Sequence, residues 1–369
     1  MKMSVQTDVN CQGRGTATRR DFLQGAASLA VASAPVFAAA AADKPDGIRA
    51  VMLHMGMNMW GDWHAPGEPV AKGRRYANDE IFFSEDIWRR TVLHAAKKSY
   101  NMVVMDLGEF LKYPSHPELA VKGSWSADRM RAEVRRLKEM GLEPIPSLNF
   151  SATHDCWLQE YHRMLSTRIY YNVCSDILKD VAEIFETPRM IHIGFDEECY
   201  KLQSGRGVIM IRQHEMWWHD LYWFVNTVEK LGMRAIVSAD YGWKHPEYVK
   251  KMPKSTVQQN WYYNQDAQGY VIENMADEFK PQLQLYIDLE KAGFDQLPCV
   301  TNWISERAKK AGLKNNSENS RKMVEFCRRH IAPERLLGYM MASWADTQGE
   351  ATCRFNCAGI DQLAAALDT

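Results

Sequence analysis

Residues 189–198 read RMIHIGFDEE, and this stretch gives the strongest indication of both the fold and the candidate site. Its first half is a short apolar run behind Pro188, which predicts a buried strand. Three carboxylates follow at once, namely Asp196, Glu197 and Glu198. An unpaired carboxylate is costly to bury, so acids at the end of a hydrophobic strand indicate either a solvated loop or the acid and base of a site.

The alternation of apolar strands with amphipathic helices continues on both sides of this stretch. Besides the central strand, we expect strands at 49–57, 101–107, 142–149, 233–239, 255–260, 296–301 and 335–342, and helices at 84–99, 126–140, 167–185, 214–231, 281–291, 317–330 and 359–367. Strands that alternate with helices predict right-handed crossovers and a parallel sheet of the α/β class. Eight such units close most simply into a (β/α)8 TIM barrel. A doubly wound open sheet is the alternative, but no Gly-rich turn follows the first strand to hold a nucleotide.

The N-terminal 42 residues have the pattern of a twin-arginine export signal. Arg19 and Arg20 precede a mild, Ala-rich run, and small residues at 38–42 offer a cleavage site. The run is too short and too mild for a stable membrane span. We therefore expect residues 1–42 to be the signal, with the twin-arginine translocase as a partner, and residues 43–369 to form one catalytic domain in the periplasm or outside the cell.

Composition argues against several classes of partner. The formal net charge is −1, which gives no electrostatic reason to expect nucleic acid or an anionic membrane. The seven cysteines after the signal include no CxxC pair, so neither a zinc framework nor a dense disulfide scaffold is indicated. We expect most of them to be buried thiols, and Cys353 and Cys357 are the pair that export would allow to join. No cofactor or metal is expected.

Acids, amides and aromatic residues follow the predicted strands, whereas the strand bodies are apolar. In an α/β barrel the chemistry lies at these C-terminal strand ends. Aromatic faces pack on the apolar faces of sugars, and carboxylates or amides bind sugar hydroxyls, so the pattern predicts a carbohydrate site. The substrate-binding candidates are His54, Asn58, Trp60, Glu109, Asn149, His154, Asp155, His192, Asp240, Trp261, Tyr263, Trp303, Trp344 and Asp346.

Side-chain alternation orients the central stretch. If Ile191 and Ile193 face the helices, Asp196 faces the barrel interior at its rim and His192 lies below it. Along a strand, Glu197 would point to the face opposite Asp196. It therefore reaches the site only if the chain has already turned at this point. His192 is equally compatible with a catalytic role and with a satisfied interior histidine. Gly194 is expected to leave room above it.

The segment His192–Glu197, HIGFDE, resembles the HxGGDE signature of the family 20 glycoside hydrolases, the β-N-acetylhexosaminidases. The helix before it and the segment at 250–261, KKMPKSTVQQNW, are also similar to this family. The resemblance implies a TIM barrel in which Asp196 orients the substrate's 2-acetamido group and Glu197 is the general acid and base. It implies retaining catalysis in which the acetamido group itself attacks the anomeric carbon. We thus expect an exported glycosidase that removes a terminal N-acetylhexosamine or a related sugar.

Three positions differ from the pattern of the family. Phe195 stands in place of the second glycine and is expected to narrow the space near the sugar ring. The first strand lacks the family's arginine, with His54 or Asn58 nearby, and the third strand ends in LNFSATHD in place of an acid-bearing DxPGH segment. These differences leave open which sugar is the substrate. Without an acetamido group, another acid would have to serve as nucleophile or base, and the candidates are Asp346, Asp240 and Glu109.

Two further classes of function are weighed against hydrolysis. A non-hydrolytic carbohydrate-binding barrel would keep the aromatic mouth and bind saccharides without turnover. A metal-dependent hydrolase is disfavoured because no HxH motif follows the first strand and the histidines are scattered.

Overall fold

The computed structural model describes residues 47–61, 63, 76–203, 206–264, 270–304, 309 and 316–369, with Trp60 described by its backbone alone. These residues lie in one compact unit, Asp46–Thr369. The predicted export signal at residues 1–42 and its cleavage site lie outside the described residues. Within the described part of the chain, no helix has the length and apolarity needed to cross a membrane.

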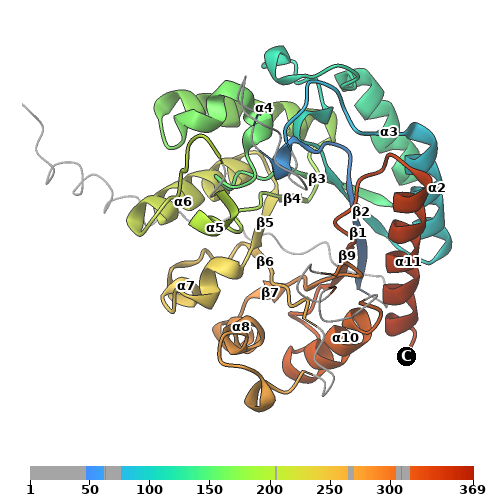
Figure 1. Ribbon diagram of the computed structural model, residues 1–369, viewed down its shortest axis with the longest axis vertical. Helices are drawn as coiled ribbons and strands as arrows, with labels where there is room; N and C mark the ends of the chain where they lie inside the picture. The colour runs from blue at the N-terminus through green and yellow to red at the C-terminus, as the bar shows by residue number, and fades with distance from the viewer. Residues whose placement is uncertain are drawn as a thin grey trace, which may run out of the picture. The chain divides into compact units, whose positions relative to one another are not determined.

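The sheet is parallel, and its strands run in chain order around a barrel (Figure 1). The strands are β1 Ile48–His54, β2 Met102–Asp106, β3 Glu143–Ser147, β4 Met190–His192, β5 Arg234–Ser238, β6 Val257–Gln259, β7 Asp295–Gln296, β8 Cys299–Val300 and β9 Gly338–Ala342. The strands are short, and β1, β2, β4 and β9 are rich in Val, Ile and Met, as expected for strands that are buried on both faces.

The strands β7 and β8 are two halves of one barrel strand. They are separated by two residues only, one of which is Pro298, which has no N–H to donate. On one side this segment pairs with β6 and Trp261, and on the other it pairs with Leu336 and β9. Because β9 also pairs with β1, the strands form a closed ring of eight strand positions. The predicted (β/α)8 fold is confirmed.

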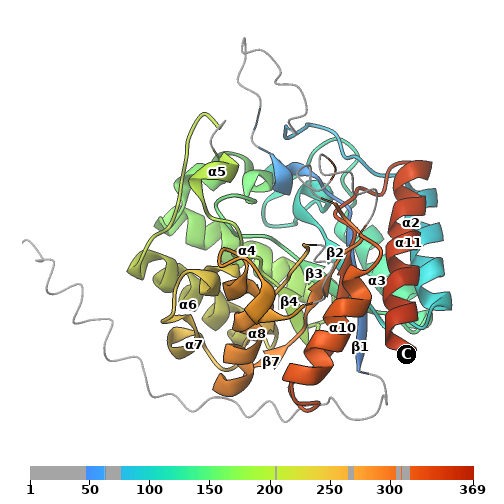
Figure 2. The same cartoon turned by 60° about the horizontal axis from the view of Figure 1, so that its bottom comes forward.

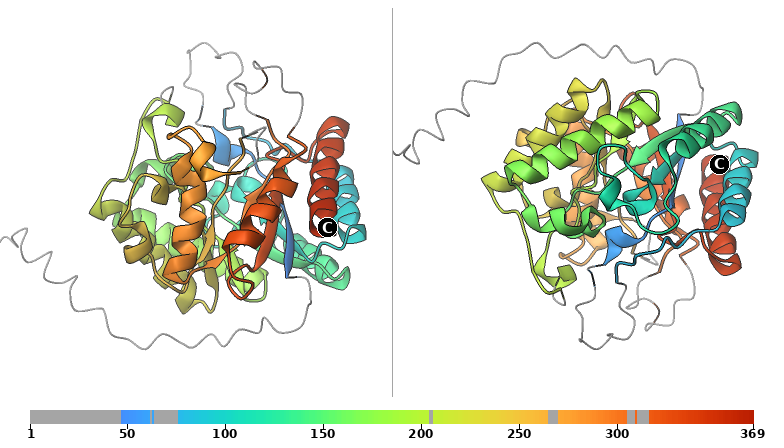
Figure 3. Two further views of the ribbon diagram at one scale, coloured as in Figure 1. Left: turned by 90° about the horizontal axis from the view of Figure 1, so that it is seen from below. Right: turned by 90° about the horizontal axis from the view of Figure 1, so that it is seen from above.

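Helices surround the barrel, and α2 and α11 pack side by side near the first strand β1 and the last strand β9, which pair with each other (Figures 2 and 3). Ser84, Ser126 and Thr167 cap α2, α3 and α4, since each side-chain oxygen accepts a hydrogen bond from the third residue after it. The α-helices are α2 Glu85–Lys97, α3 Ala127–Glu139, α4 Arg168–Ile184, α5 Tyr200–Gln203, α6 Glu215–Lys230, α7 Tyr248–Lys251, α8 Lys280–Ala292, α10 Asn319–His330 and α11 Glu350–Leu367. The 3-10 helices are η1 Asn58–Trp60, η2 Gly108–Phe110, η3 Pro117–Leu119, η4 Cys156–Met164, η5 Asp240–Trp243 and η6 Ile272–Asn274.

Alternation along the strands divides the apolar residues into two cores. On β4, Met190 belongs to the cluster inside the barrel, whereas Ile191 and Ile193 belong to the cluster between sheet and helices. The same division holds on β1, where Met52 points inward and Val51 outward. The inner cluster closes the barrel below the strand ends, so an open space is possible only at the C-terminal face.

The connection between β5 and β6, where no helix was predicted, contains only η5 and the four-residue α7. Two details of the sequence interpretation need correction. The last helix starts at Glu350, nine residues before the predicted start. Cys353 and Cys357 are free thiols one turn apart on α11, so the disulfide considered from the sequence is not formed.

Candidate functional site

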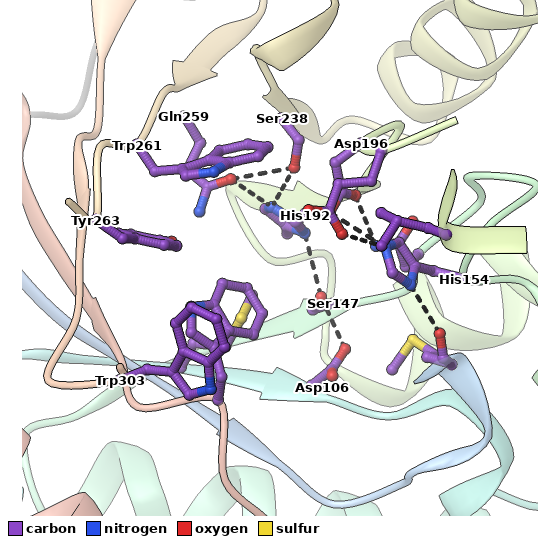
Figure 4. Close-up of a pocket in the computed structure, with 16 residues that line it drawn as sticks. Asp106, Ser147, His154, His192, Asp196, Ser238, Gln259, Trp261, Tyr263 and Trp303 are labelled. Carbon is purple, nitrogen blue, oxygen red and sulfur yellow. Dashed lines mark hydrogen bonds and ion pairs between the residues drawn. The ribbon is translucent and has the colours of Figure 1, made fainter. Parts of the chain in front are cut away.

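A pocket of about 420 Å³ opens at the C-terminal ends of the strands (Figure 4). It is a size that suits a small-molecule ligand. Its walls combine acids and amides on one side with aromatic rings on the other. The lining residues are Met52, Met59, Asp106, Ser147, Asn149, His154, His192, Asp196, Glu197, Leu202, Ser238, Gln259, Trp261, Tyr263, Trp303 and Trp344.

A sharp backbone turn brings both candidate acids into this pocket. The strand β4 ends at His192, and Gly194, Phe195 and Glu197 then have φ values of +69°, +78° and +58°. Left-handed conformations are unusual for Phe and Glu and persist only where surrounding contacts enforce them. Because the chain turns here, Glu197 lines the pocket beside Asp196 despite its opposite parity.

Gly194 allows Asn149 to approach the turn. A Cβ atom at Gly194 would overlap the side-chain amide of Asn149, so the expected open space above His192 is in fact filled. Asn149 Nδ2 donates to Asp196 Oδ1 at 2.8 Å, and its Oδ1 accepts from the N–H of Ser151 at 2.9 Å. These two contacts orient the carboxylate of Asp196.

His154 lies between the two acids. Its Nε2 is 3.3 Å from Glu197 Oε2 and 3.6 Å from Asp196 Oδ2, and its Nδ1 is 3.0 Å from the carbonyl oxygen of Met59. Burial lowers the pKa of His154, but the neighbouring charges of Asp196 and Glu197 raise it more strongly, to about 9. At neutral pH the imidazole is therefore protonated and pairs with the acids.

Polar side chains of consecutive strands form a layer beneath the acids, which we call the floor (Figure 4). Asp106, Ser147 and His192 follow one another around the barrel, with Ser147 Oγ 3.2 Å from both Asp106 Oδ1 and His192 Nδ1. His192 Nε2 is 3.2 Å from Gln259 Oε1, and Ser238 Oγ donates to that same oxygen at 3.1 Å. The floor consists of Asp106, Ser147, His192, Ser238 and Gln259.

Phe195 does not narrow the pocket, contrary to the expectation from sequence. Its ring is buried in the outer core against Trp217 and Phe224, at centroid distances of 5.7 and 5.4 Å. The guanidinium of Arg212 covers the ring at 4.3 Å. The side chain points outward because it has the parity of Ile191 and Ile193.

Arg212 also joins a buried group of charges behind the turn. It pairs with Glu198, and its Nη1 is 3.1 Å from Asp220 Oδ2, with all three side chains at most 3% exposed. Its Nη2 donates to the carbonyl oxygen of Phe150 at 2.8 Å. Glu198 in turn accepts from the N–H of Ala152 at 2.8 Å. Glu198 is thus a structural partner rather than a third acid of the pocket.

Asn58 and Glu109, both predicted to bind substrate, lie outside the pocket lining. Glu109 is buried, and its Oε1 accepts from the backbone N–H groups of Met57 and Asn58 at 2.6 and 3.0 Å. Burial raises the pKa of Glu109 to about 7, although these N–H groups oppose the shift. The side chain of Asn58 is bound to the backbone of Asn78. Both residues therefore hold the loop after β1 in place.

Three predicted acids and one histidine also lie off the pocket lining. Asp240 Oδ2 accepts from the N–H of Glu197 at 2.9 Å, and burial together with the charge of Asp196 raises the pKa of Asp240. Asp155 is fully buried, and Asp346 accepts from the N–H of Gln348. His54 is held against Asp106 and packs near Trp344. The side chain of Trp60 lies outside the described residues.

The remaining predicted residues do meet in the pocket, and sequence reasoning missed others. The structure brings together Asn149, His154, His192, Asp196, Glu197, Trp261, Tyr263, Trp303 and Trp344. Of the missed residues, Ser147, Ser238 and Gln259 each lie two positions before a predicted residue. Because residues two apart on a strand share a face, extending the alternation inward would have found them. Met59 and Leu202 also line the pocket, but no strand alternation in the sequence would have predicted this.

One group of side chains in the described part of the chain has the donor atoms for a metal ion. One ligand atom each from His154, Asp196 and Glu197 lies within 4.8 Å of the others. A histidine and two carboxylates form a donor set that zinc accepts. Without a metal ion, the protonated His154 pairs with the two carboxylates by charge. The same arrangement is therefore as compatible with an acid and base pair as with a metal site.

Comparisons with known proteins give structural matches only. No family model matches the chain, and no curated protein matches it. Solved structures resemble it with low identity. A β-N-acetylhexosaminidase from Bacteroides fragilis NCTC 9343 has a TM-score of 0.57 and 13% identity over 86% of this chain and 65% of that chain. The GH20 β-N-acetylhexosaminidase from Streptomyces coelicolor A3(2) has a TM-score of 0.57 and 14% identity over 86% and 64%.

Dispersin B, at a TM-score of 0.51 and 14% identity, matches over 78% of this chain and 96% of that chain. This chain spans slightly less than two thirds of the length of the Bacteroides fragilis and Streptomyces coelicolor structures. At such identities the likeness shows the fold, which is the barrel seen in GH20 β-N-acetylhexosaminidases.

Replacing Arg212 with Met should lower the free energy of unfolding by about 3–5 kcal/mol, because Glu198 and Asp220 would remain as buried, uncompensated carboxylates. Urea denaturation followed by circular dichroism measures the loss. The matched control is Arg321→Met, whose partners Glu318 and Glu325 are exposed, so its loss should stay below about 1 kcal/mol. Equal losses in the two variants would contradict the assigned role of Arg212.

Replacing His154 with Gln should destabilise the protein in a pH-dependent manner. Because folding raises the pKa of His154 from 6.5 to about 9, its stabilising effect is complete below the lower value and disappears as the pH rises through the higher one. The difference in unfolding free energy from the native protein should reach at most about 3 kcal/mol near pH ~6 and largely vanish near pH ~10. Thermal and urea denaturation at both pH values test this, with the exposed His219→Gln variant as control. A difference independent of pH would refute it.

Proposed function

We propose that this chain is a retaining glycoside hydrolase that removes a terminal N-acetylhexosamine or a closely related sugar. The observation that carries the proposal is the meeting of Asp196 and Glu197 at the rim of a pocket lined by aromatic rings. The HIGFDE motif supports these positions, and solved structures with the same barrel are named as β-N-acetylhexosaminidases.

The two acids differ in the way that their proposed roles require. The side chain of Asp196 is 13% exposed and held by Asn149, which suits a group that must orient and polarise an acetamido group. The side chain of Glu197 is 43% exposed at the rim, which suits a group that protonates the leaving oxygen and then activates water. Neighbouring acids in different environments can be kept in different protonation states, as acid catalysis near neutral pH demands.

The proposed mechanism retains the configuration of the anomeric carbon because the acetamido group of the substrate takes the place of the second catalytic carboxylate. Asp196 and Glu197 lie close enough together to act on the same sugar, since one carboxylate oxygen of each lies within 4.8 Å of the other. In the proposed reaction the substrate's acetamido oxygen attacks the anomeric carbon, and Glu197 gives its proton to the departing oxygen. Water then opens the cyclic intermediate, and Glu197 takes up the proton of that water.

The aromatic side of the pocket supplies the surface for the sugar. Trp261, Tyr263, Trp303 and Trp344 line it from the ends of the later strands, opposite the acids. Trp261 packs against Trp243 at 5.0 Å between ring centroids, which holds its face toward the cavity. Such rings bury the apolar faces of a pyranose while the acids and amides take its polar groups.

Replacing Glu197 with Gln should lower kcat by about 10²- to 10⁴-fold, because general acid catalysis is lost while the shape of the side chain is kept. The assay uses aryl glycosides with and without a 2-acetamido group, and the proposed mechanism expects turnover of the acetamido sugars only. Glu198→Gln serves as a control for loss of a neighbouring acid that does not line the pocket. Saccharide binding without turnover of any glycoside would instead support a non-hydrolytic sugar-binding barrel. Loss of activity on treatment with a chelator would instead support a metal ion bound by His154, Asp196 and Glu197.

We also propose that the enzyme is exported through the twin-arginine translocase and acts in the periplasm or outside the cell. The support is the sequence around Arg19 and Arg20 with its Ala-rich continuation. Changing both arginines to lysine should leave the activity in the cytoplasmic fraction, and N-terminal sequencing of the native product should begin close to residue 43. Unchanged fractionation of the double variant would overturn the proposal.

A further inference from the structure

The floor of the pocket contains one hydrogen-bond acceptor more than its own groups can satisfy. Gln259 presents a carbonyl oxygen to His192 Nε2 at 3.2 Å, and this oxygen can only accept. The ring therefore carries its proton on Nε2. Burial lowers the pKa of His192, so the ring is neutral and its Nδ1 is an acceptor.

The hydroxyl of Ser147 faces two acceptors with a single proton. Its Oγ is 3.2 Å from His192 Nδ1 and 3.2 Å from Asp106 Oδ1. A serine hydroxyl donates once, so only one of these atoms can receive its proton. In the structure Ser147 donates to Asp106 Oδ1, which leaves His192 Nδ1 without a donor among these groups. A second donor to Asp106 Oδ1 would free the proton of Ser147 for His192.

The other oxygen of Asp106 is fixed independently. His54 Nδ1 is hydrogen-bonded to Asp106 Oδ2, and both side chains are almost fully buried. Since His54 and Asp106 are register partners on β1 and β2, the strand pairing itself sets this contact. The carboxylate is thereby held with Oδ1 on the side of Ser147, and Asp106 forms part of the pocket lining.

We propose that Asp106 Oδ1 accepts a hydrogen bond from a hydroxyl group of the bound sugar, which supplies the proton that the floor lacks. This inference rests on the proposed function for the identity of the ligand. Glu197 at the rim is 43% exposed, whereas the side chain of Asp106 is 6% exposed. The bond to be cleaved lies at the rim, so the floor meets the edge of the ring that is farthest from the anomeric carbon.

The acceptor chemistry also restricts the class of sugar. A buried carboxylate requires a donor, so the recognised position must carry a free hydroxyl rather than an ether, a carboxylate or a sulfate. No Lys or Arg is present among the residues that line the described pocket, and the protonated His154 there is already paired with Asp196 and Glu197, so no cation is left to offset an acidic sugar. The site thus selects a neutral, unbranched terminal sugar.

Calorimetric titration with N-acetylglucosamine tests the proposal directly. The native mature protein is compared on the parent sugar and on analogues in which the hydroxyl at carbon three, four or six is replaced by hydrogen or by fluorine. Fluorine cannot donate a proton. Replacing the hydroxyl at one of these positions should therefore weaken binding about 10- to 100-fold, because a hydrogen bond to a charged group contributes this much to affinity. The loss should be similar for hydrogen and for fluorine.

The variant Asp106→Asn identifies the partner of that hydroxyl. It should bind the parent sugar about 10- to 100-fold more weakly, and the penalty for deleting the sensitive hydroxyl should shrink to about threefold. Glu109→Gln is the matched control, because it alters a buried acid three residues away that does not line the pocket. This control should keep the full penalty. Circular dichroism and the melting temperature check that both variants fold.

The outcomes separate this inference from the proposed function. If the glycosides are hydrolysed but Asp106→Asn keeps the full deletion penalty, Asp106 is not the acceptor and the inference falls while the function stands. If no glycoside is hydrolysed but the sugar binds with the expected dependence on Asp106, the function falls and the inference stands. A fluorinated analogue that binds as well as the parent sugar, or the absence of any sugar binding, overturns the inference.

Discussion

The guanidinium of Arg212 is the group on which the geometry of both candidate acids depends. It pairs with Glu198 and Asp220, donates to the carbonyl of Phe150 and packs on the ring of Phe195. These partners come from the segments after β3 and β4 and from α6, so one side chain ties three parts of the structure together. Asp196 and Glu197 lie between two residues that Arg212 holds. The left-handed backbone of this turn is therefore held from behind the pocket, in addition to the contact that Asn149 makes with Asp196 from within it.

The fold was predictable because alternation and helical spacing act locally and agree along most of the chain. Parity alone separated Ile191 and Ile193 from His192 and Asp196, and the structure has the two isoleucines on the outer face and the two polar residues in the pocket. For the connection after β5 no helix was predicted, and the structure has only the short η5 and α7 there. The stacked rings of Trp217, Tyr241 and His245 beside it are tertiary contacts that no local sequence pattern indicates.

The candidate site was predictable where a residue's position follows from its strand, and not where it depends on a loop. Trp261 and Trp344 reach the pocket because their strands have regular parity. Asn58 and Glu109 were misplaced because the segments after β1 and β2 turn them toward each other, so that neither side chain lines the pocket. The prediction that Phe195 narrows the pocket was wrong for a different reason. A side chain in place of a glycine fills the pocket only if it points to the inner face of the sheet, and Phe195 points to the outer face.

The inner apolar cluster beneath the floor makes the pocket a dead end. Anything that enters must leave through the same mouth, past Glu197. On the proposed reaction, the part of the substrate beyond the cleaved bond is nearest the opening and departs first. The released monosaccharide, still held by the floor, departs last, and until it does the next substrate cannot enter. The depth that gives the site its selectivity therefore also sets the order of product release and makes the free sugar a competitor of the substrate.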